Sequence, residues 1–106
     1  MTARRRFDQV ELGEALPSAA VAAPADGAPL AGPIARFVAA WAGQDAELDG
    51  VRMLCHPRPV GPVDVLRLAG RVYGRHMDGS RRVEVEVTGH DGSGHRLCGM
   101  VRVKLA

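Results

Sequence analysis

Histidine and cysteine side chains are the groups in this sequence that most readily bind metals or attack substrates. The four histidines are His56, His76, His90 and His95, and the two cysteines are Cys55 and Cys98. No two histidines stand four residues apart, which is the spacing that places two imidazoles on one face of a helix. The cysteines lie far apart in the sequence, so we expect no metal site. Both cysteines fall in stretches with a strand-like pattern, and we expect them to be buried thiols.

The balance of charge and hydrophobicity argues against several other kinds of function. The formal net charge is +2 at pH 7, which is too small to indicate nucleic acid as a partner. Arginines cluster at positions 4–6, and residues 1–6 are expected to form a flexible basic tail. No apolar run is long enough for a signal peptide or a membrane span, so we expect a cytoplasmic protein without membrane association. The 106 residues predict a single domain over 1–106.

One helix is clearly indicated near the middle of the chain. Apolar side chains recur there at intervals of three and four residues, at Leu30, Ile34, Phe37, Val38 and Trp41. Pro33 suits the first turn of a helix and Gly43 suits its C-terminal cap. The other side of this helix is mostly alanine, so the pattern predicts a helix that a sheet can wrap around.

The remainder of the sequence has the alternation typical of strands. The clearest case is the run in which Val83, Val85 and Val87 alternate with charged residues. Further strands are predicted over residues 51–56, 65–72 and 97–104, and residues 18–25 fit either a short strand or a helix. These elements predict an α+β fold, in which a curled antiparallel sheet wraps around one central helix.

Four stretches of the sequence resemble MaoC-like (R)-specific enoyl-thioester hydratases, which have the hotdog fold. They are Phe7–Pro17 (FDQVELGEALP), Arg36–Gly43 (RFVAAWAG), Arg58–Val72 (with RPV, PVDVL and GRV) and the hairpin strands within Val83–Val103. Each stretch alone is weakly specific, and their order and spacing along nearly the whole chain carry the resemblance.

The resemblance implies hydration of 2-enoyl thioesters, or dehydration of 3-hydroxyacyl thioesters, carried on coenzyme A or an acyl carrier protein. It implies no cofactor. Members of the family use the motif Asp-x-Asn-Pro-(Leu/Ile/Val)-His just before the helix, where the Asp and His activate one water. A base near the water and N–H donors for the thioester oxygen are what this chemistry requires.

The corresponding stretch here is Asp26-Gly27-Ala28-Pro29-Leu30-Ala31. Asp26 stands at the motif's Asp position, whereas Ala28 replaces the Asn and Ala31 replaces the His. The chain then passes directly to Gly32, without a stretch that family members place before the helix. Loss of a positioned catalytic group costs about 10²–10⁴-fold in rate, so we expect no effective hydration by this chain alone.

The resemblance also implies binding residues, each with a plainer alternative. Asp26 is either a catalytic remnant or a turn residue, and Gly32 either donates an N–H to the thioester oxygen or only breaks the chain before the helix. Phe37 and Trp41 either line an acyl pocket or fill the core. Four arginines either bind phosphates or form a solvated sheet face: Arg58, Arg67, Arg71 and Arg75.

The function we predict is a non-catalytic hotdog subunit of a heteromeric acyl-thioester hydratase or dehydratase. Hotdog domains usually pair side by side, so a dimer or higher assembly is expected, with a catalytic hotdog partner or with a second copy. One alternative is a homodimeric acyl-thioester-binding protein without activity. Another is an enzyme whose relocated base is His56, working with Asp26.

Overall fold

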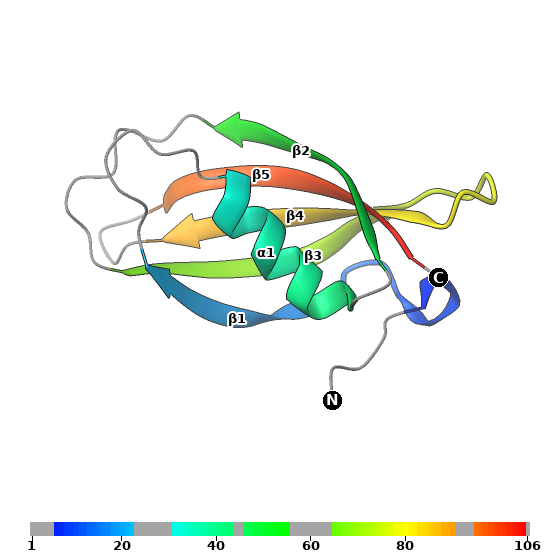
Figure 1. Cartoon of the computed structure of the whole chain (residues 1–106), viewed down its shortest axis with the longest axis horizontal. Helices are drawn as coiled ribbons and strands as arrows, with labels where there is room; N and C mark the ends of the chain where they lie inside the picture. Colours follow the sequence, from blue (N-terminus) through cyan, green and yellow to red (C-terminus); the bar gives the residue numbers. More distant parts are fainter. Residues whose placement is uncertain (1–5, 23–30, 44–45, 56–64, 91–94, 106) are drawn as a thin grey trace.

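The computed structural model describes residues 6–22, 31–43, 46–55, 65–90 and 95–105, without the side chains of residues 22, 31, 53–55, 65–66 and 95–97. The elements, in chain order, are the 3-10 helix η1 (Phe7–Gln9), strand β1 (Ala15–Ala22), helix α1 (Ala31–Ala42), and strands β2 (Glu47–Cys55), β3 (Val65–Arg75), β4 (Arg82–His90) and β5 (His95–Lys104). The helix crosses one face of the sheet (Figure 1).

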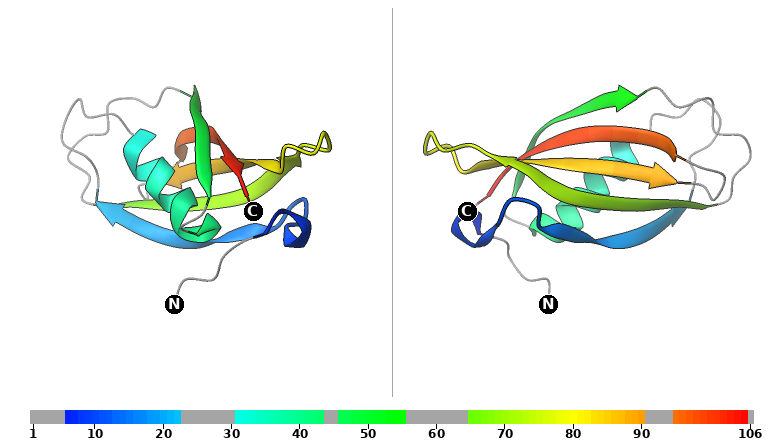
Figure 2. Two further views of the ribbon diagram at one scale, coloured as in Figure 1. Left: turned by 45° about the vertical axis from the view of Figure 1, so that its right-hand side comes forward. Right: turned by 180° about the vertical axis from the view of Figure 1, so that it is seen from behind.

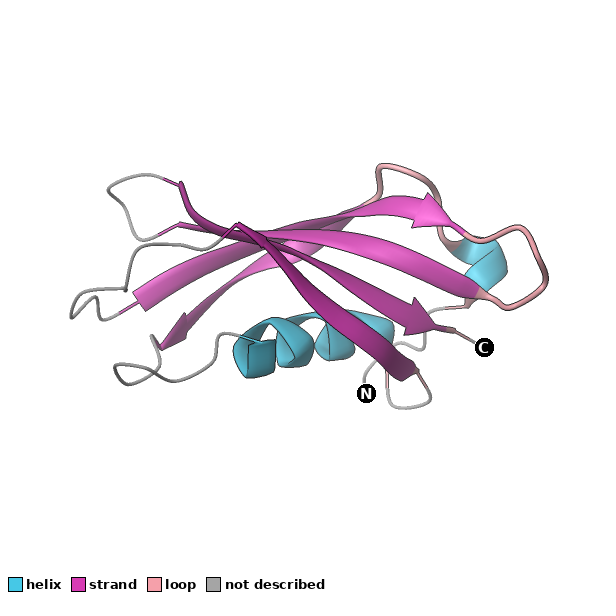
Figure 3. Cartoon of the chain, turned by 90° about the horizontal axis from the view of Figure 1, so that it is seen from above, coloured by secondary structure: helices cyan, strands magenta, loops and turns pink. Residues whose placement is uncertain are grey.

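The strands form one antiparallel sheet in the order β1-β3-β4-β5-β2. Seen from behind, β1 and β2 are the two edges, with β3, β4 and β5 between them (Figure 2). The sheet is strongly twisted and bends over α1 (Figure 3). The predicted α+β arrangement of a curled sheet around one helix is confirmed.

The inner face of the sheet is made by small branched side chains. Val83, Val85 and Val87 of β4 have no exposed surface, and the residues between them face outward. Val101 and Val103 of β5 are buried in the same way. Because side chains alternate between the two faces of a strand, this arrangement separates an apolar face that contacts α1 from a charged outer face.

Helix α1 buries the stripe that its sequence predicts. Ile34 and Val38 are completely buried, and Phe37 and Trp41 are each 8% exposed. Gly43 directly follows the last helical residue, Ala42. It has a φ of 96° and donates its N–H to the carbonyl of Ala39 at 3.0 Å. Only glycine adopts this backbone conformation without strain, so Gly43 is the predicted C-terminal cap.

A close approach between β3 and α1 depends on Gly70. A Cβ atom at this position would lie 3.1 Å from Cε2 of Phe37 and 3.3 Å from the carbonyl oxygen of Glu86. The glycine therefore leaves the space that the Phe37 ring occupies against the sheet.

Hydrogen bonds and a ring contact hold the N-terminal segment against the C-terminal part of β3. Arg75 donates a hydrogen bond to the carbonyl oxygen of Phe7 at 3.2 Å, and its guanidinium lies 4.6 Å from the centre of the Phe7 ring. The backbone of Gly13 and Glu14 bonds to Val72 at 2.9 and 2.8 Å. These contacts hold the residues before β1, including the turn η1, against the sheet. Residues 1–5 of the predicted basic tail lie outside the described residues.

The cysteine prediction is wrong for Cys98. This residue is half-buried and disulfide-bonded, and the other cysteine of the chain, Cys55, is its register partner on the adjacent strand. The strand pairing brings together two positions that stand 43 residues apart in the sequence.

The two edges of the sheet differ in how well they could accept another strand. Strand β1 contains Pro17, and its pairing with β3 shifts register between Leu16 and Ala19. Strand β2 has nine residues and no proline. Strand β2 also shifts register in its pairing with β5, between Leu48 and Gly50 and between Met53 and Cys55, so the proline is what distinguishes the two edges. Because proline cannot donate a hydrogen bond to a neighbouring strand, β2 is the better edge for pairing. Within the described residues, no helix is long and apolar enough to cross a membrane.

Candidate functional site

A groove of about 620 Å³ runs between edge strand β1 and helix α1. Its strand wall consists of Pro17, Ser18, Ala19 and Val21, and its helix wall consists of Pro33, Arg36, Phe37, Ala40 and Trp41. The helix residues recur at intervals of three and four, so they lie on one side of α1.

Phe37 and Trp41 take part in both the core and the groove. Each side chain is 8% exposed and belongs to the central apolar cluster, and each also lines the groove. The indole N–H of Trp41 donates a hydrogen bond to Oε2 of Glu14 at 3.4 Å, which ties the end of α1 to the start of β1. Core packing is therefore confirmed for both residues, and their role in an acyl pocket remains a prediction.

Arg36 gives the groove its charge. Its side chain is exposed on the open side of α1, and Nη1 lies 3.6 Å from the point where a Cβ of Gly32 would stand. The guanidinium thus extends back toward the first turn of the helix, which contains no acidic residue. Among the described residues, none of those that line the groove carries a negative charge. Anions are favoured in such a place, because the N-terminal end of a helix is itself electropositive.

The predicted catalytic stretch is covered only at its end. Asp26 and Ala28 lie outside the described residues. Ala31 is the first residue of α1, although its side chain is not described, and Gly32 follows as an exposed residue in the first turn. Ala31, at the position of the motif's histidine, therefore lies at the first residue of the helix and not before it, which agrees with the absence of the stretch that family members place there. The role of Asp26 remains a prediction.

The arginines of β3 are used in different ways. Arg71 is exposed and pairs with Glu86 across the outer face at 3.4 Å, whereas Arg75 is held by Phe7. Arg67 is exposed at the register position opposite His90. This arrangement favours the solvated sheet face over a convergent phosphate site. His56 and Arg58 lie outside the described residues.

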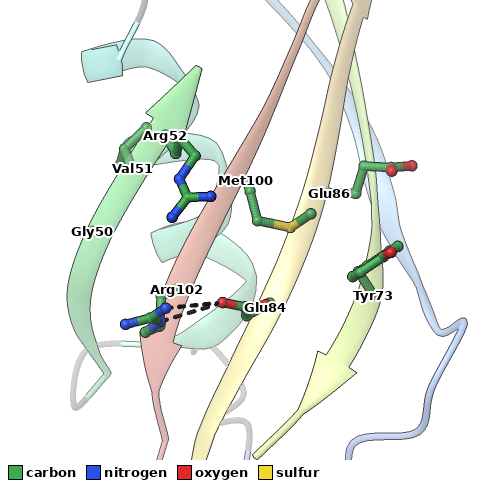
Figure 4. A pocket seen from close by; sticks show the side chains of 8 residues that line it. All are labelled: Gly50, Val51, Arg52, Tyr73, Glu84, Glu86, Met100 and Arg102. Atoms are coloured by element: carbon green, nitrogen blue, oxygen red, sulfur yellow. Dashed lines mark hydrogen bonds and ion pairs between the residues drawn. The ribbon is translucent and has the colours of Figure 1, made fainter. Parts of the chain in front are cut away.

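A second hollow, of about 520 Å³, lies on the outer face of the sheet (Figure 4). Met100 and Arg102 of β5 lie between Arg52 of β2 on one side and Glu84 and Glu86 of β4 on the other. Arg102 bonds to Glu84 through Nε and Nη2 at 3.3 and 3.2 Å. Sequence reasoning missed this hollow, because alternation shows which residues face outward but not where the surface sinks.

The comparisons with known proteins support the fold through structure rather than sequence. No family model matches the chain, and no curated protein matches it. The structure is similar to a chain in the crystal structure of the ChsH1-ChsH2 complex from Mycobacterium tuberculosis, with a TM-score of 0.73 and 16% sequence identity. The match covers 91% of this chain and 98% of that chain, so the two have nearly the same length. At this identity the likeness establishes the fold, and the chain has the predicted hotdog fold.

Proposed function

We propose that this chain is the non-catalytic subunit of a heteromeric MaoC-like hydratase or dehydratase, acting on acyl thioesters of coenzyme A or an acyl carrier protein. The observation that carries the proposal is the structural match to a chain of a two-component complex, over almost the full length of both chains. The similar chain is about as long as this one and comes from a complex, as expected for the kind of subunit proposed here.

The substitutions in the motif supply the chemical reason for assigning catalysis to a partner. Hydration needs a base that removes a proton from water as the oxygen attacks the double bond. Alanine side chains at positions 28 and 31 neither accept a proton nor orient the water. Asp26 alone would lack the second group of the pair, so the partner must supply an intact Asp and His.

In the proposed complex, this chain contributes a folded subunit that has an apolar groove. The aromatic rings of Phe37 and Trp41 line the groove and can contact an acyl group. Gly32 lies in the first turn of α1 and is exposed to solvent. Strand β2 offers a free edge for a partner's strand. In this proposal the assembly closes one sheet across β2 while the groove of this chain takes the acyl group.

Co-expression tests the proposal. The chain is produced together with a candidate partner, a hotdog protein from the same organism that has the complete Asp-x-Asn-Pro-x-His motif, and the purified material is assayed for hydration of an enoyl thioester. We expect a stable complex of the two chains that is active, and this chain alone to be inactive. A stable homodimer of this chain that ignores the second protein would contradict the proposal.

A homodimeric acyl-thioester-binding protein is the second candidate, and one observation favours it. The described lining of the groove comes from this chain, and a homodimer that presents it could bind an acyl group without a catalytic partner. A lone homodimer that binds acyl thioesters without converting them is the result that would select this candidate. Turnover by the isolated chain that is abolished by Asp26→Asn would instead indicate an enzyme with relocated residues.

A further inference from the structure

Among the described residues, the lining of the groove between β1 and α1 is largely apolar and includes one cation. Phe37, Trp41 and Val21 supply apolar surface, and Arg36 is the charged residue among those that line it. Its volume of about 620 Å³ lies within the range of about 300–1,000 Å³ that is common for small-molecule sites. A molecule that fits these surfaces has an apolar body and a negative group close to it.

Arg36 is placed to act as the anion-binding group. It is exposed, and the described residues include no carboxylate paired with it. Several arginines of the outer sheet face differ, since Arg71, Arg82 and Arg102 each have a carboxylate partner. A guanidinium that is not already paired retains its donors for a ligand.

We propose that the groove binds a fatty carboxylate or a similar anionic amphiphile, with its chain against Phe37 and Trp41 and its anionic group on Arg36. This inference goes beyond the proposed function, because a fatty acid that is joined to a carrier as a thioester no longer has the carboxylate that Arg36 would bind. It does not require the catalytic partner, because the residues that carry it lie in this chain.

Fluorescence of Trp41 measures binding directly, since it is the single tryptophan of the chain. The probes are decanoate, 1-decanol and decyltrimethylammonium, which share a chain length and differ in head-group charge, together with hexanoate and octanoate. We expect decanoate to bind tightest and affinity to rise roughly 2- to 4-fold with each added methylene, because each one removes further apolar surface from water.

Two pairs of variants test which groove residue contacts the anionic group of the ligand and which contacts its apolar chain. Arg36→Gln should weaken decanoate binding about 2- to 5-fold, the size expected of an exposed charge pair, and should leave decanol binding unchanged. Arg52→Gln, which removes an exposed cation from the outer hollow, is the matched control and should change neither. Ala40→Leu should fill the groove and abolish binding, whereas Ala40→Ser should preserve it.

Three results would overturn the inference: equal affinity for the three head groups, an Arg36→Gln variant that binds decanoate as tightly as the wild type, or binding that survives Ala40→Leu. Thermal unfolding of each variant confirms that the fold is intact, since Arg36 and Ala40 are exposed. The inference and the proposed function fail separately. Decanoate binding without a hydratase partner refutes only the proposed function, whereas an active complex whose groove binds no anionic amphiphile refutes only this inference.

Discussion

Replacing Gly70 by alanine puts a methyl group into the closest contact between strand β3 and helix α1. The new carbon would stand 3.1 Å from the Phe37 ring, 3.3 Å from the carbonyl oxygen of Glu86 and 3.4 Å from Cδ2 of Leu16. The carbonyl belongs to β4, whose backbone is held by its pairing with β3, so the Phe37 ring and the Leu16 side chain must move instead. Such overpacking costs about 1–3 kcal/mol. Alanine recovers about 0.5–1 kcal/mol, because glycine loses more backbone freedom on folding.

We therefore expect Gly70→Ala to lower the free energy of unfolding by roughly 0.5–2 kcal/mol. In a domain of this size that corresponds to a melting temperature lower by several degrees, at roughly 4–8 °C for each kcal/mol. The assay is urea unfolding followed by circular dichroism, with thermal unfolding as a second measurement.

Gly50→Ala is the matched control for this experiment. Gly50 is an exposed strand glycine, and a Cβ there would meet nothing within 4 Å. This variant should unfold like the wild type or be slightly more stable. If Gly70→Ala is as stable as Gly50→Ala, the Phe37 ring does not lie against the sheet, and the description of the core is wrong.

Three further predictions concern other contacts. Trp41→Ala should lower the free energy of unfolding by about 3–5 kcal/mol in the same assay, since it empties a large buried site; a loss below about 1 kcal/mol would contradict its place in the core. Arg75→Met should speed amide exchange in η1 by about 5- to 30-fold, the effect of about 1–2 kcal/mol, because it removes the bond and the ring contact to Phe7; uniform acceleration that includes β4 would refute this local role. Cys98→Ser should lower stability by about 2–5 kcal/mol without reductant, and added reductant should bring the wild type to the same value. A wild type that is insensitive to reductant would show that Cys98 forms no disulfide.

The elements that a short stretch of sequence is sufficient to specify were predictable. Alternation of valine with charged residues is sufficient to place β4, and the spacing of Ile34, Phe37 and Trp41 together with Gly43 is sufficient to place α1. Strand ends were predicted less well. Strand β3 continues to Arg75, beyond the predicted end, because its backbone remains paired with β4 after the apolar alternation stops.

Features that depend on pairing between distant segments were not predictable from the sequence. The disulfide at Cys98 follows from the register between β2 and β5, which no local pattern encodes. The groove depends on which strand becomes the neighbour of α1 at the sheet edge, so Arg36 could only be recognised as a residue on the less apolar side of the helix. Periodicity was sufficient to place Phe37 and Trp41 on the buried side of the helix, whereas their role in binding an acyl group came from the resemblance alone and remains a prediction.

The most direct test of the proposal that catalysis resides in the partner uses the complex of the two chains and two separate substitutions. Hydration of an enoyl thioester is measured after the Asp and His of the partner's motif are replaced, and separately after Asp26→Asn in this chain. The proposal predicts that the first change abolishes turnover and that the second leaves it nearly unchanged. Turnover that survives loss of the partner's pair, and then disappears with Asp26→Asn, would contradict it.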